Sequence, residues 1–370
     1  MFRGKMQPVY INGRFLGAAI SGVPRYGREI LSALDEFLAE SEYSGQIEIL
    51  VPRSVQVDVA YRKMTVRQVG WLTGHAWEQL ELPFYSWGGV LYSPSGSAPL
   101  LHPRNVLTIH DAIVFAYPDG CPIAYRLWYC FLSIVLSRTA AHVMTVSEFS
   151  KREITHYCKS NPHKITVAYP GVQYLASVPG DKSILARYSL RKHGYVLAVG
   201  SSAPNKNFAG ILRTADRLAS TGIDVALVGK TGVSVGQHGI KMKQLDMSLV
   251  KDIGFVTDAE LRSLYENAGA FIFPSFYEGF GLPPLEALSL GCPTVISNCA
   301  SLPEVCGEVA LKCDPHSTED MVAKVQNAIH LREDEGNAIR FKRFTTRYEN
   351  RDSALRVWKV ILAVQSGGRA

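Results

Sequence analysis

Two glutamates on either side of a glycine-rich bend are the residues whose types and spacing most favour chemistry. Glu278 directly precedes the bend Gly279-Phe-Gly281, and Glu286 follows it, with seven residues between the two acids. A carboxylate offers two acceptor oxygens, which suit the paired hydroxyl groups of a ribose or a hexose. The alternative is that Glu286 only caps a helix and that Glu278 is solvated, since acidic residues favour helix N-termini. We expect this segment to bind a hydroxylated ligand.

A strand and a helix must hold this bend in place. The apolar run that ends at Phe273 predicts a buried strand, and a helix is expected to start at Pro283 or Pro284 and to stop at Gly291. The backbone N–H groups of the bend then lie at a helix N-terminus, where anions and hydroxyl oxygens bind favourably. The predicted ligand contacts in the bend are Gly279, Phe280, Gly281 and Leu282.

Short apolar strands alternate with helical stretches along the whole chain. The predicted strands are 47–51, 90–92, 106–109, 142–146, 196–199, 225–228, 270–273 and 294–297. The predicted helices are 25–37, 123–137, 208–220, 258–267 and 284–290. This alternation is typical of parallel sheets that are covered by helices on both faces.

The length of 370 residues favours two domains rather than one. A polar stretch with several glycines and prolines, residues 171–194, predicts the boundary between them. We therefore predict an α/β fold with two Rossmann-like domains that face a central cleft. They span 1–175 and 190–350, and a basic C-terminal helix, 351–370, is expected to pack back toward the N-terminal domain.

Charge and composition exclude several classes of protein. The chain is 47% hydrophobic and 19% charged, which favours a folded globular protein. Its net charge of +6 is too small for a nucleic-acid-binding stripe, so no nucleic-acid partner is expected. From Arg340 onward, eight basic residues stand against two acidic ones, which accounts for the whole excess. This segment could meet an anionic lipid or substrate, or it could be a solvated helix face.

Cysteine usage and hydropathy bear on location. The seven cysteines include no CxxC pair and no secretory signal is recognisable at the start, which favours a reducing, cytoplasmic compartment and argues against a zinc ribbon. The longest apolar run, 127–136, is bounded by Arg126 and Arg138. It is far shorter than the ~20 residues of a membrane-spanning helix, so we expect a buried helix there.

Several further motifs carry a resemblance to a known family. In chain order they are Ser21-Gly-Val-Pro-Arg-Tyr26, Thr108-Ile-His-Asp111, Thr145-Val-Ser-Glu-Phe-Ser-Lys151, Tyr169-Pro-Gly-Val172, Leu197-Ala-Val-Gly200, Pro204-Asn-Lys-Asn207 and Gly254-Phe-Val256. Together with the Glu-x7-Glu pair, they resemble the family 4 glycosyltransferases, which have the two-domain GT-B architecture. The resemblance covers nearly the whole chain. The pattern is most similar to bacterial mannosyltransferases that build surface polysaccharide.

The resemblance implies a nucleotide-diphosphate sugar as donor, bound by the C-terminal domain. It places Glu286 on the ribose, Glu278 and the amides of the bend on the hexose, and Lys206 on the diphosphate. It also places His110 beside the donor sugar, so the catalytic candidates are His110, Glu278 and Lys206. The remaining donor-binding candidates are Gly22, Val23, Arg25, Lys230 and Val256.

One cation of the usual phosphate clamp is missing. The family pairs the lysine with a nearby arginine, whereas Ser201 and Asn205 stand at the candidate positions here. Our hypothesis is that Arg25 or Lys230 supplies the second cation. The sequence contains no Asp-x-Asp pair that would hold a divalent ion, so we expect Lys206 and helix N-termini to bind the diphosphate, with no metal and no cofactor.

The N-terminal domain is expected to bind a saccharide acceptor. Aromatic rings pack against the faces of sugars, and the acceptor-binding candidates are Trp71, His75, Trp77 and Asp111, with Glu78 and the loop 93–99 in the same region. A tryptophan that is simply part of the core is the alternative interpretation.

The activity implied by the resemblance is retaining, metal-independent hexosyl transfer in surface polysaccharide synthesis. GDP-mannose is the expected donor, and a lipid-linked saccharide or an oligosaccharide is the expected acceptor. The expected location is the cytoplasm, with peripheral binding to the cytoplasmic face of the membrane as an option. Two alternatives stay open: a sugar-nucleotide epimerase with the same fold, and a non-catalytic carbohydrate-binding scaffold.

Overall fold

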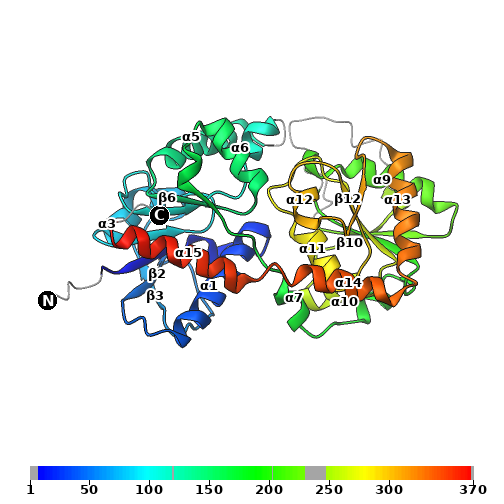
Figure 1. Cartoon of the computed structure of the whole chain (residues 1–370), viewed down its shortest axis with the longest axis horizontal. Helices are drawn as coiled ribbons and strands as arrows, with labels where there is room; N and C mark the ends of the chain where they lie inside the picture. The colour runs from blue at the N-terminus through cyan, green and yellow to red at the C-terminus, as the bar shows by residue number, and fades with distance from the viewer. Residues whose placement is uncertain (1–6, 119–120, 202, 230–246, 368–370) are drawn as a thin grey trace. The chain divides into compact units, whose positions relative to one another are not determined.

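The computed structural model describes residues 7–118, 121–201, 203–229 and 247–367 (Figure 1). The chain forms two compact units. The first comprises Met1–Phe115, Ala124–Gly171 and Glu349–Ala370, and the second comprises Ala116–Ile123 and Val172–Tyr348. Each unit contains one parallel sheet with helices packed against it, which confirms the predicted α/β class.

The sheet of the first unit has the strand order β3-β2-β1-β4-β5-β6-β7, and each pair of neighbours is parallel. Its strands are β1 (Val9–Asn12), β2 (Ile47–Pro52), β3 (Thr65–Val69), β4 (Val90–Ser93), β5 (Asn105–Thr108), β6 (His142–Thr145) and β7 (Ile165–Val167). Every residue of the strands β2, β4, β5 and β6 is buried, as expected for strands that are covered on both faces.

Helices pack around this first sheet. They are α1 (Gly22–Glu40), α2 (Gly74–Ala76), the π-helical turn η2 (Trp77–Glu81), α3 (Leu82–Ser86), α4 (Ile113–Ala116), α5 (Ile123–Thr139), α6 (Glu148–Cys158) and α15 (Asn350–Gln365), with short 3₁₀ turns η1 (Arg14–Gly17) and η4 (Pro162–Lys164). The last helix, α15 (red in Figure 1), packs along α1 (blue) and also contacts β4, so the end of the chain completes the first unit.

The sheet of the second unit has the order β10-β9-β8-β11-β12-β13 and is also parallel. Its strands are β8 (Tyr195–Val199), β9 (Asp224–Val228), β10 (Lys251–Gly254), β11 (Ala270–Phe273), β12 (Thr294–Ser297) and β13 (Leu311–Cys313). Its helices are α7 (Gln173–Ser177), α8 (Ser183–Arg187), α9 (Phe208–Ala219), α10 (Asp258–Asn267), α11 (Leu282–Ser289), α12 (Leu302–Cys306), α13 (Thr318–Leu331) and α14 (Glu335–Thr345), with 3₁₀ turns η5 (Pro204–Lys206) and η7 (Met247–Leu249).

The core of the second unit shows why these helices form. The apolar residues of α9 recur at helical spacing, with Phe208, Ile211, Leu212, Ala215 and Leu218 all buried against the sheet and α13. On α10, the Thr257 side chain and Glu260 form a reciprocal capping box that fixes the start of the helix. Helices α11 and α14 pack against each other, and α10 contacts α11 (Figure 1).

Both sheets reverse their strand order at one point. In the first unit the chain runs outward from β1 through β2 to β3 and then returns to the other side of β1 with β4. In the second unit it runs from β8 to β10 and returns beside β8 with β11. Loops leave such a switch point in opposite directions, so ligands bind there at the carboxyl ends of the strands. A ligand site is therefore expected among the residues that follow β8 and β11 and among those that follow β1 and β4.

The expectation of a buried helix at 127–136 is correct for one face only. The run lies in α5, whose Leu132 and Leu136 are buried in the core, whereas Leu127 is 63% exposed and Phe131 is 49% exposed. The expected C-terminal helix is α15, which packs along α1 of the first unit, and the basic residues Arg340 and Lys342 lie before it, on α14 of the second unit. Arg351 forms an ion pair with Glu40 of α1, at 2.6 Å.

The contact of α15 with the first unit can be tested at Trp358. This side chain is buried and its ring meets the ring of Tyr43 edge-on, with 4.8 Å between the centroids. The variant Trp358→Ala should lower the free energy of unfolding of the first unit by about 3–5 kcal/mol, because it leaves a cavity under α15. Urea unfolding followed by circular dichroism measures the shift. Arg356→Ala, an exposed position on the same helix, is the control and should change stability by less than about 0.5 kcal/mol.

Candidate active site

The switch point of the second sheet brings Lys206 and Glu278 together. Lys206 ends the 3₁₀ turn η5 after β8, and Glu278 lies in the loop after β11. Because β8 and β11 are neighbours in the sheet, the Lys206 ammonium lies 2.7 Å from Glu278 Oε1 although the two residues are 72 positions apart. The lysine side chain is 26% exposed and also lies 5.2 Å from the centroid of the Phe273 ring. A cation and an anion therefore form a half-buried pair at the carboxyl ends of β8 and β11, where a ligand site is expected.

Asn205 ties the two loops to each other. Its side-chain amide donates to the backbone carbonyl of Tyr277 at 3.0 Å, and the backbone carbonyl of Asn205 accepts from the backbone N–H of Phe276 at 2.8 Å. Asn205 is buried. Asn205, at one of the positions where the resemblance led us to expect an arginine, therefore fixes the loop that carries Lys206 against the loop that carries Glu278.

The glycine bend requires glycine at Gly281. This residue has φ +117°, and a Cβ added there would lie 2.6 Å from Leu302 Cδ2. The hydroxyl oxygen of Ser301 lies 2.9 Å from the Glu278 carbonyl oxygen and 2.7 Å from that of Phe280, which holds the bend against the start of α12. Helix α11 begins at Leu282, as the sequence predicted within two residues.

The side chain of Phe280 has a structural role. It is buried, and its ring meets that of Tyr348 at 5.9 Å between centroids. Among the predicted ligand contacts of the bend, Phe280 can therefore offer only its backbone.

Glu286 is the fifth of the eight residues of α11, and its carboxylate is buried. One oxygen, Oε2, accepts a hydrogen bond of 2.9 Å from the hydroxyl of Tyr265, and the other, Oε1, accepts one from the hydroxyl of Tyr174. Burial and the charge of Glu286 raise the pKa of Tyr265 well above its ordinary value, so this phenol remains a donor. Sequence patterns did not identify either tyrosine, since each contact joins residues on different helices.

His110 lies at the carboxyl end of β5 in the first unit. Its Nε2 lies 2.8 Å from the carbonyl oxygen of Pro94, and its ring meets that of Tyr26 edge-on, with 4.8 Å between centroids. Burial lowers the pKa of His110 to about 4, against the smaller effect of the hydrogen bond to Pro94. A carbonyl oxygen can only accept, so Nε2 carries the proton and His110 is a neutral imidazole at physiological pH.

The other predicted residues of the first unit lie after β5 and at the start of α1. Asp111 accepts a hydrogen bond of 3.0 Å from the backbone N–H of Ile113, where α4 begins. Gly22 is the first residue of α1, and a Cβ at this position would meet no protein atom within 4 Å. Val23 is exposed and Arg25 is half-buried in the same turn. The fold itself therefore does not demand a glycine at position 22.

Glu78 is the centre of a second cluster of polar side chains. From the sequence we placed it only in the region of the acceptor. Glu78 lies in the π-helical turn η2 and is fully buried. Its Oε1 accepts hydrogen bonds from Asn12 at 2.7 Å, Ser97 at 3.0 Å and Arg14 at 3.2 Å. Asn12 ends β1, Arg14 follows it and Ser97 follows β4, so the cluster lies at the switch point of the first sheet.

The other oxygen of Glu78 faces His75. Glu78 Oε2 lies 3.1 Å from His75 Nδ1, and the hydroxyl of Tyr129 lies 3.2 Å from His75 Nε2. Burial raises the pKa of Glu78. The hydrogen bonds from His75, Asn12 and Ser97 and the charge of Arg14 together lower this pKa by more than burial raises it, so the net shift is downward. Glu78 is therefore an anion that orients the His75 ring through Nδ1–H.

The two predicted tryptophans differ. Trp71 is 78% exposed, and the guanidinium carbon of Arg53 lies 3.9 Å from its ring centroid. Trp77 is fully buried, packs with Leu50 and Leu91, and donates its indole N–H to the carbonyl of Val69 at 2.9 Å. The prediction that Trp77 contacts the acceptor was wrong, because this side chain belongs to the core.

The last two predicted donor residues are Val256 and Lys230. Val256 is half-buried and follows the end of β10 at Gly254. Lys230 lies outside the described residues. In the part of the chain that the structure describes, no group of three or more His, Cys, Asp or Glu side chains could hold a metal ion.

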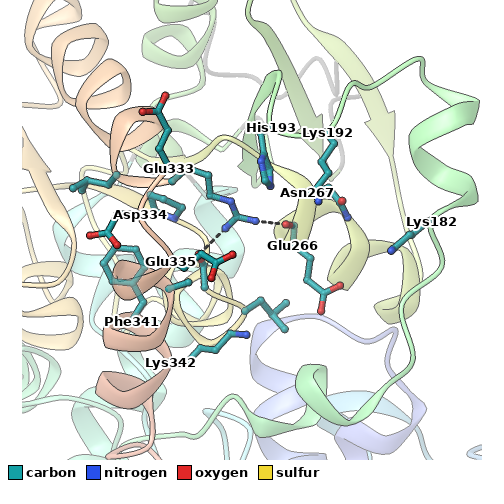
Figure 2. A pocket seen from close by; sticks show the side chains of 16 residues that line it. Lys182, Lys192, His193, Glu266, Asn267, Glu333, Asp334, Glu335, Phe341 and Lys342 are labelled. Atoms are coloured by element: carbon teal, nitrogen blue, oxygen red, sulfur yellow. Dashed lines mark hydrogen bonds between the residues drawn. The ribbon is translucent and has the colours of Figure 1, made fainter.

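A pocket of about 580 Å³ lies at the amino ends of the strands of the second sheet, opposite the end where Lys206 and Glu278 meet (Figure 2). It is lined by residues that precede β8, β11 and β12, such as His193, Asn267 and Pro293. The guanidinium of Arg332 donates to the backbone carbonyls of Gly291 and Glu266 there (dashed in Figure 2). Ligands of doubly wound sheets bind at the carboxyl ends of the strands, so we do not assign ligand binding or catalysis to this pocket.

The neutral state of His110 predicts how stability depends on pH. The unfolded chain protonates this histidine near pH 6.5, whereas the folded chain does so only near pH 4. The free energy of unfolding should therefore fall as the pH is lowered, and the share of His110 between pH 7 and pH 5 should be about 2 kcal/mol. Urea titrations at both values should show a smaller difference for His110→Asn than for the parent protein. His163→Asn, an exposed position, should keep the full difference; equal pH dependence in H110N would contradict the assignment.

The chain resembles known proteins in sequence and in structure. Residues 186–343 match the family Glycosyl transferases group 1. The O-antigen chain mannosyltransferase B of Escherichia coli is 32% identical over 249 residues, which is 65% of each chain. The O-antigen chain mannosyltransferase RfbU of Salmonella typhimurium is 28% identical over 255 residues, 68% of this chain and 67% of that protein. The alignments thus span about two thirds of these relatives.

A solved structure extends the likeness in fold to almost the whole chain. The structure of Anabaena HepE in complex with UDP-glucose superimposes with a TM-score of 0.69 over 98% of this chain and all of that one, at 14% identity. Residues 186–343, which contain the second doubly wound sheet, the Glu-x7-Glu bend after β11 and Lys206 after β8, thus match the family Glycosyl transferases group 1, and the chain is similar to the two O-antigen chain mannosyltransferases over about two thirds of its length.

Proposed function

We propose that the protein is a retaining, metal-independent hexosyltransferase that transfers mannose from GDP-mannose to a saccharide in surface polysaccharide synthesis. The observation that carries this proposal is the meeting of Lys206, Glu278 and the glycine bend at the switch point of the second sheet. The names of the two mannosyltransferase relatives support the sugar, and the bound UDP-glucose of HepE supports a nucleotide sugar as the donor.

The donor fits the charges and donors of this site. Glu286 would accept hydrogen bonds from the ribose, and Glu278 with the amides of Gly279–Gly281 would hold the hexose. Lys206 has three N–H donors, so its ammonium can keep Glu278 and also bind a diphosphate oxygen. Gly22, whose missing Cβ leaves open space, is a further candidate for a backbone contact with a phosphate. Arg25 remains our candidate for the second cation, beside Lys230.

The reaction exchanges one bond of the anomeric carbon for another. A hydroxyl oxygen of the acceptor forms a bond to this carbon on the face that the diphosphate leaves, while the bond from the carbon to the diphosphate oxygen breaks. The acceptor proton passes to the leaving diphosphate, and a nucleoside diphosphate is released. Negative charge grows on the diphosphate in the transition state, so Lys206 and the amides at the helix start provide electrostatic stabilisation. His110, being neutral, would hold the sugar by hydrogen bonding rather than donate a proton as an imidazolium.

The acceptor is assigned to the first unit. His75 is oriented through Nδ1 by the buried Glu78, which leaves Nε2 to accept a hydrogen bond, at present from Tyr129. This nitrogen can accept one from a sugar hydroxyl instead, and the exposed ring of Trp71 can pack against a sugar face. Asp111 is the remaining acceptor candidate.

We further propose that the acceptor is lipid-linked and that helix α5 meets the cytoplasmic face of the membrane. Among the described residues, no helix is long and apolar enough to cross a bilayer. Helix α5 exposes Ile123, Leu127 and Phe131, which lie four residues apart on one face. Its only charged residues are Arg126 and Arg138, so the helix combines an apolar face with positive charge. Such a helix suits the surface of an anionic bilayer.

The transfer reaction is tested with the purified protein and four donors: GDP-mannose, UDP-glucose, UDP-N-acetylglucosamine and dTDP-rhamnose. GDP-mannose should raise the melting temperature and release GDP, and Lys206→Ala should lower kcat by about 100-fold or more. Glu286→Gln should raise the KM for the donor by about tenfold. Lys312→Ala breaks a lysine–glutamate pair of similar length, 2.6 Å, on the surface of the same unit and should change neither constant.

The products separate this function from its rivals. An epimerase would return a changed sugar nucleotide without consuming an acceptor, and a scaffold would bind the donor without releasing nucleotide. If none of the four donors stabilises the protein or is consumed, the proposed function is wrong.

Membrane binding is tested by sedimentation with vesicles. The protein should sediment with vesicles that contain phosphatidylglycerol and much less with vesicles of phosphatidylcholine alone, and the difference should shrink in high salt. The double variant Leu127→Ser/Phe131→Ser should lose most of this binding, because it removes the apolar face of α5. Leu101→Ser, an exposed leucine of the first unit outside α5, should not. Equal binding by the double variant and the parent protein would argue against α5 as the membrane surface.

A further inference from the structure

Both oxygens of the Glu286 carboxylate accept hydrogen bonds from tyrosine hydroxyls. Tyr265 donates to Oε2 at 2.9 Å, and Tyr174 donates to Oε1. Glu286 is 5% exposed. A ribose hydroxyl that binds this carboxylate must therefore find an oxygen that a phenol already occupies.

The two tyrosines are held very differently. Tyr265 is fully buried in α10, its ring packs against that of Phe271 at 5.4 Å between centroids, and its helix has a capping box at its start. Tyr174 is half-buried on α7, a helix of five residues, and both Gln173 and Ser177 at the ends of that helix are exposed. Displacing Tyr265 would open the core, whereas Tyr174 can change its rotamer.

Helix α7 itself need not move. The side chain of Leu175 is buried, and the guanidinium of Arg262 donates to the carbonyls of Ala176 at 2.7 Å and Val178 at 2.6 Å. These contacts hold the backbone next to Tyr174. Rotation about the Tyr174 side-chain bonds is therefore enough to release Oε1.

We propose that the Tyr174 hydroxyl occupies the position of a ribose hydroxyl on Glu286 and that nucleotide binding displaces it. Tyr265 stays on Oε2 as a positioning residue that keeps Oε1 aimed at the ligand. This inference rests on the proposed function, since it takes Glu286 as the ribose-binding carboxylate. The apparent affinity for nucleotide is then reduced by the fraction of molecules in which Tyr174 covers Oε1.

The test is calorimetric binding of GDP and UDP to Tyr174→Phe. Loss of the competing hydroxyl should tighten the binding of the preferred nucleotide by about fivefold. This factor corresponds to the net contribution of one hydrogen bond that forms in competition with water. The matched control is Tyr188→Phe, because the Tyr188 hydroxyl donates to the carbonyl of Ile253 at 3.0 Å in the same unit. Y188F should bind as the parent protein does.

The 2′,3′-dideoxy form of the same nucleotide separates competition from a general change in the site. A ligand without ribose hydroxyls gains nothing from a free Oε1, so Y174F and the parent protein should bind it equally. Tyr265→Phe should have the opposite sign, weakening the binding of the ribonucleotide, because the carboxylate loses the donor that orients it.

The outcomes distinguish failure of the Tyr174 inference from failure of the proposed function. Tighter ribonucleotide binding by Y174F with unchanged dideoxynucleotide binding supports the inference. Equal or weaker ribonucleotide binding by Y174F, or an equal gain with the dideoxy form, overturns it while the proposed function stands. If the parent protein binds neither GDP nor UDP, the proposed function fails and the inference fails with it.

Discussion

The juxtaposition of two strand ends in one parallel sheet is the constraint on which the rest of the candidate site depends. Lys206 and Glu278 are far apart in the sequence, and only the return of the chain from β10 to the other side of β8 makes their strands neighbours. A different strand order would leave a solvated lysine and a solvated glutamate. The ion pair is therefore a product of topology, and the loops have only to direct the two side chains toward each other.

Those loops are fixed by contacts that leave the functional atoms available. Asn205 joins the loop after β8 to the loop after β11 through two hydrogen bonds, and Ser301 holds the bend from its other side. Gly281 takes the left-handed backbone conformation that turns the chain into α11. The side chains of Phe280 and Tyr348 anchor the bend in the core. A bend fixed in this way keeps its amides oriented before any ligand arrives, which is the requirement for electrostatic stabilisation of a leaving group.

The sequence predicted those features that local patterns encode. Buried strands read as short apolar runs, so β11 and β12 were predicted with the bounds that they have. The edge strand β3 was missed, because its sequence Thr-Val-Arg-Gln-Val is mostly exposed and polar. Trp77 was misjudged since spacing cannot say whether a ring on a short helical segment faces the core or the solvent. The tyrosines on Glu286 could not be predicted, because each contact depends on how separate helices pack.

The polar network around Glu78 and the ion pair of Lys206 with Glu278 differ in how readily they can accept a ligand. Glu78 is fully buried, and its charge is balanced by Arg14 and by neutral donors on both oxygens, so a new partner would have to break a complete network. Glu278 meets Lys206 at the surface of its unit, where both side chains keep some contact with water. An ion pair of this kind exchanges partners at low cost, since desolvation has not been completed. The first cluster is therefore suited to orienting His75, and the second to binding and releasing a charged substrate.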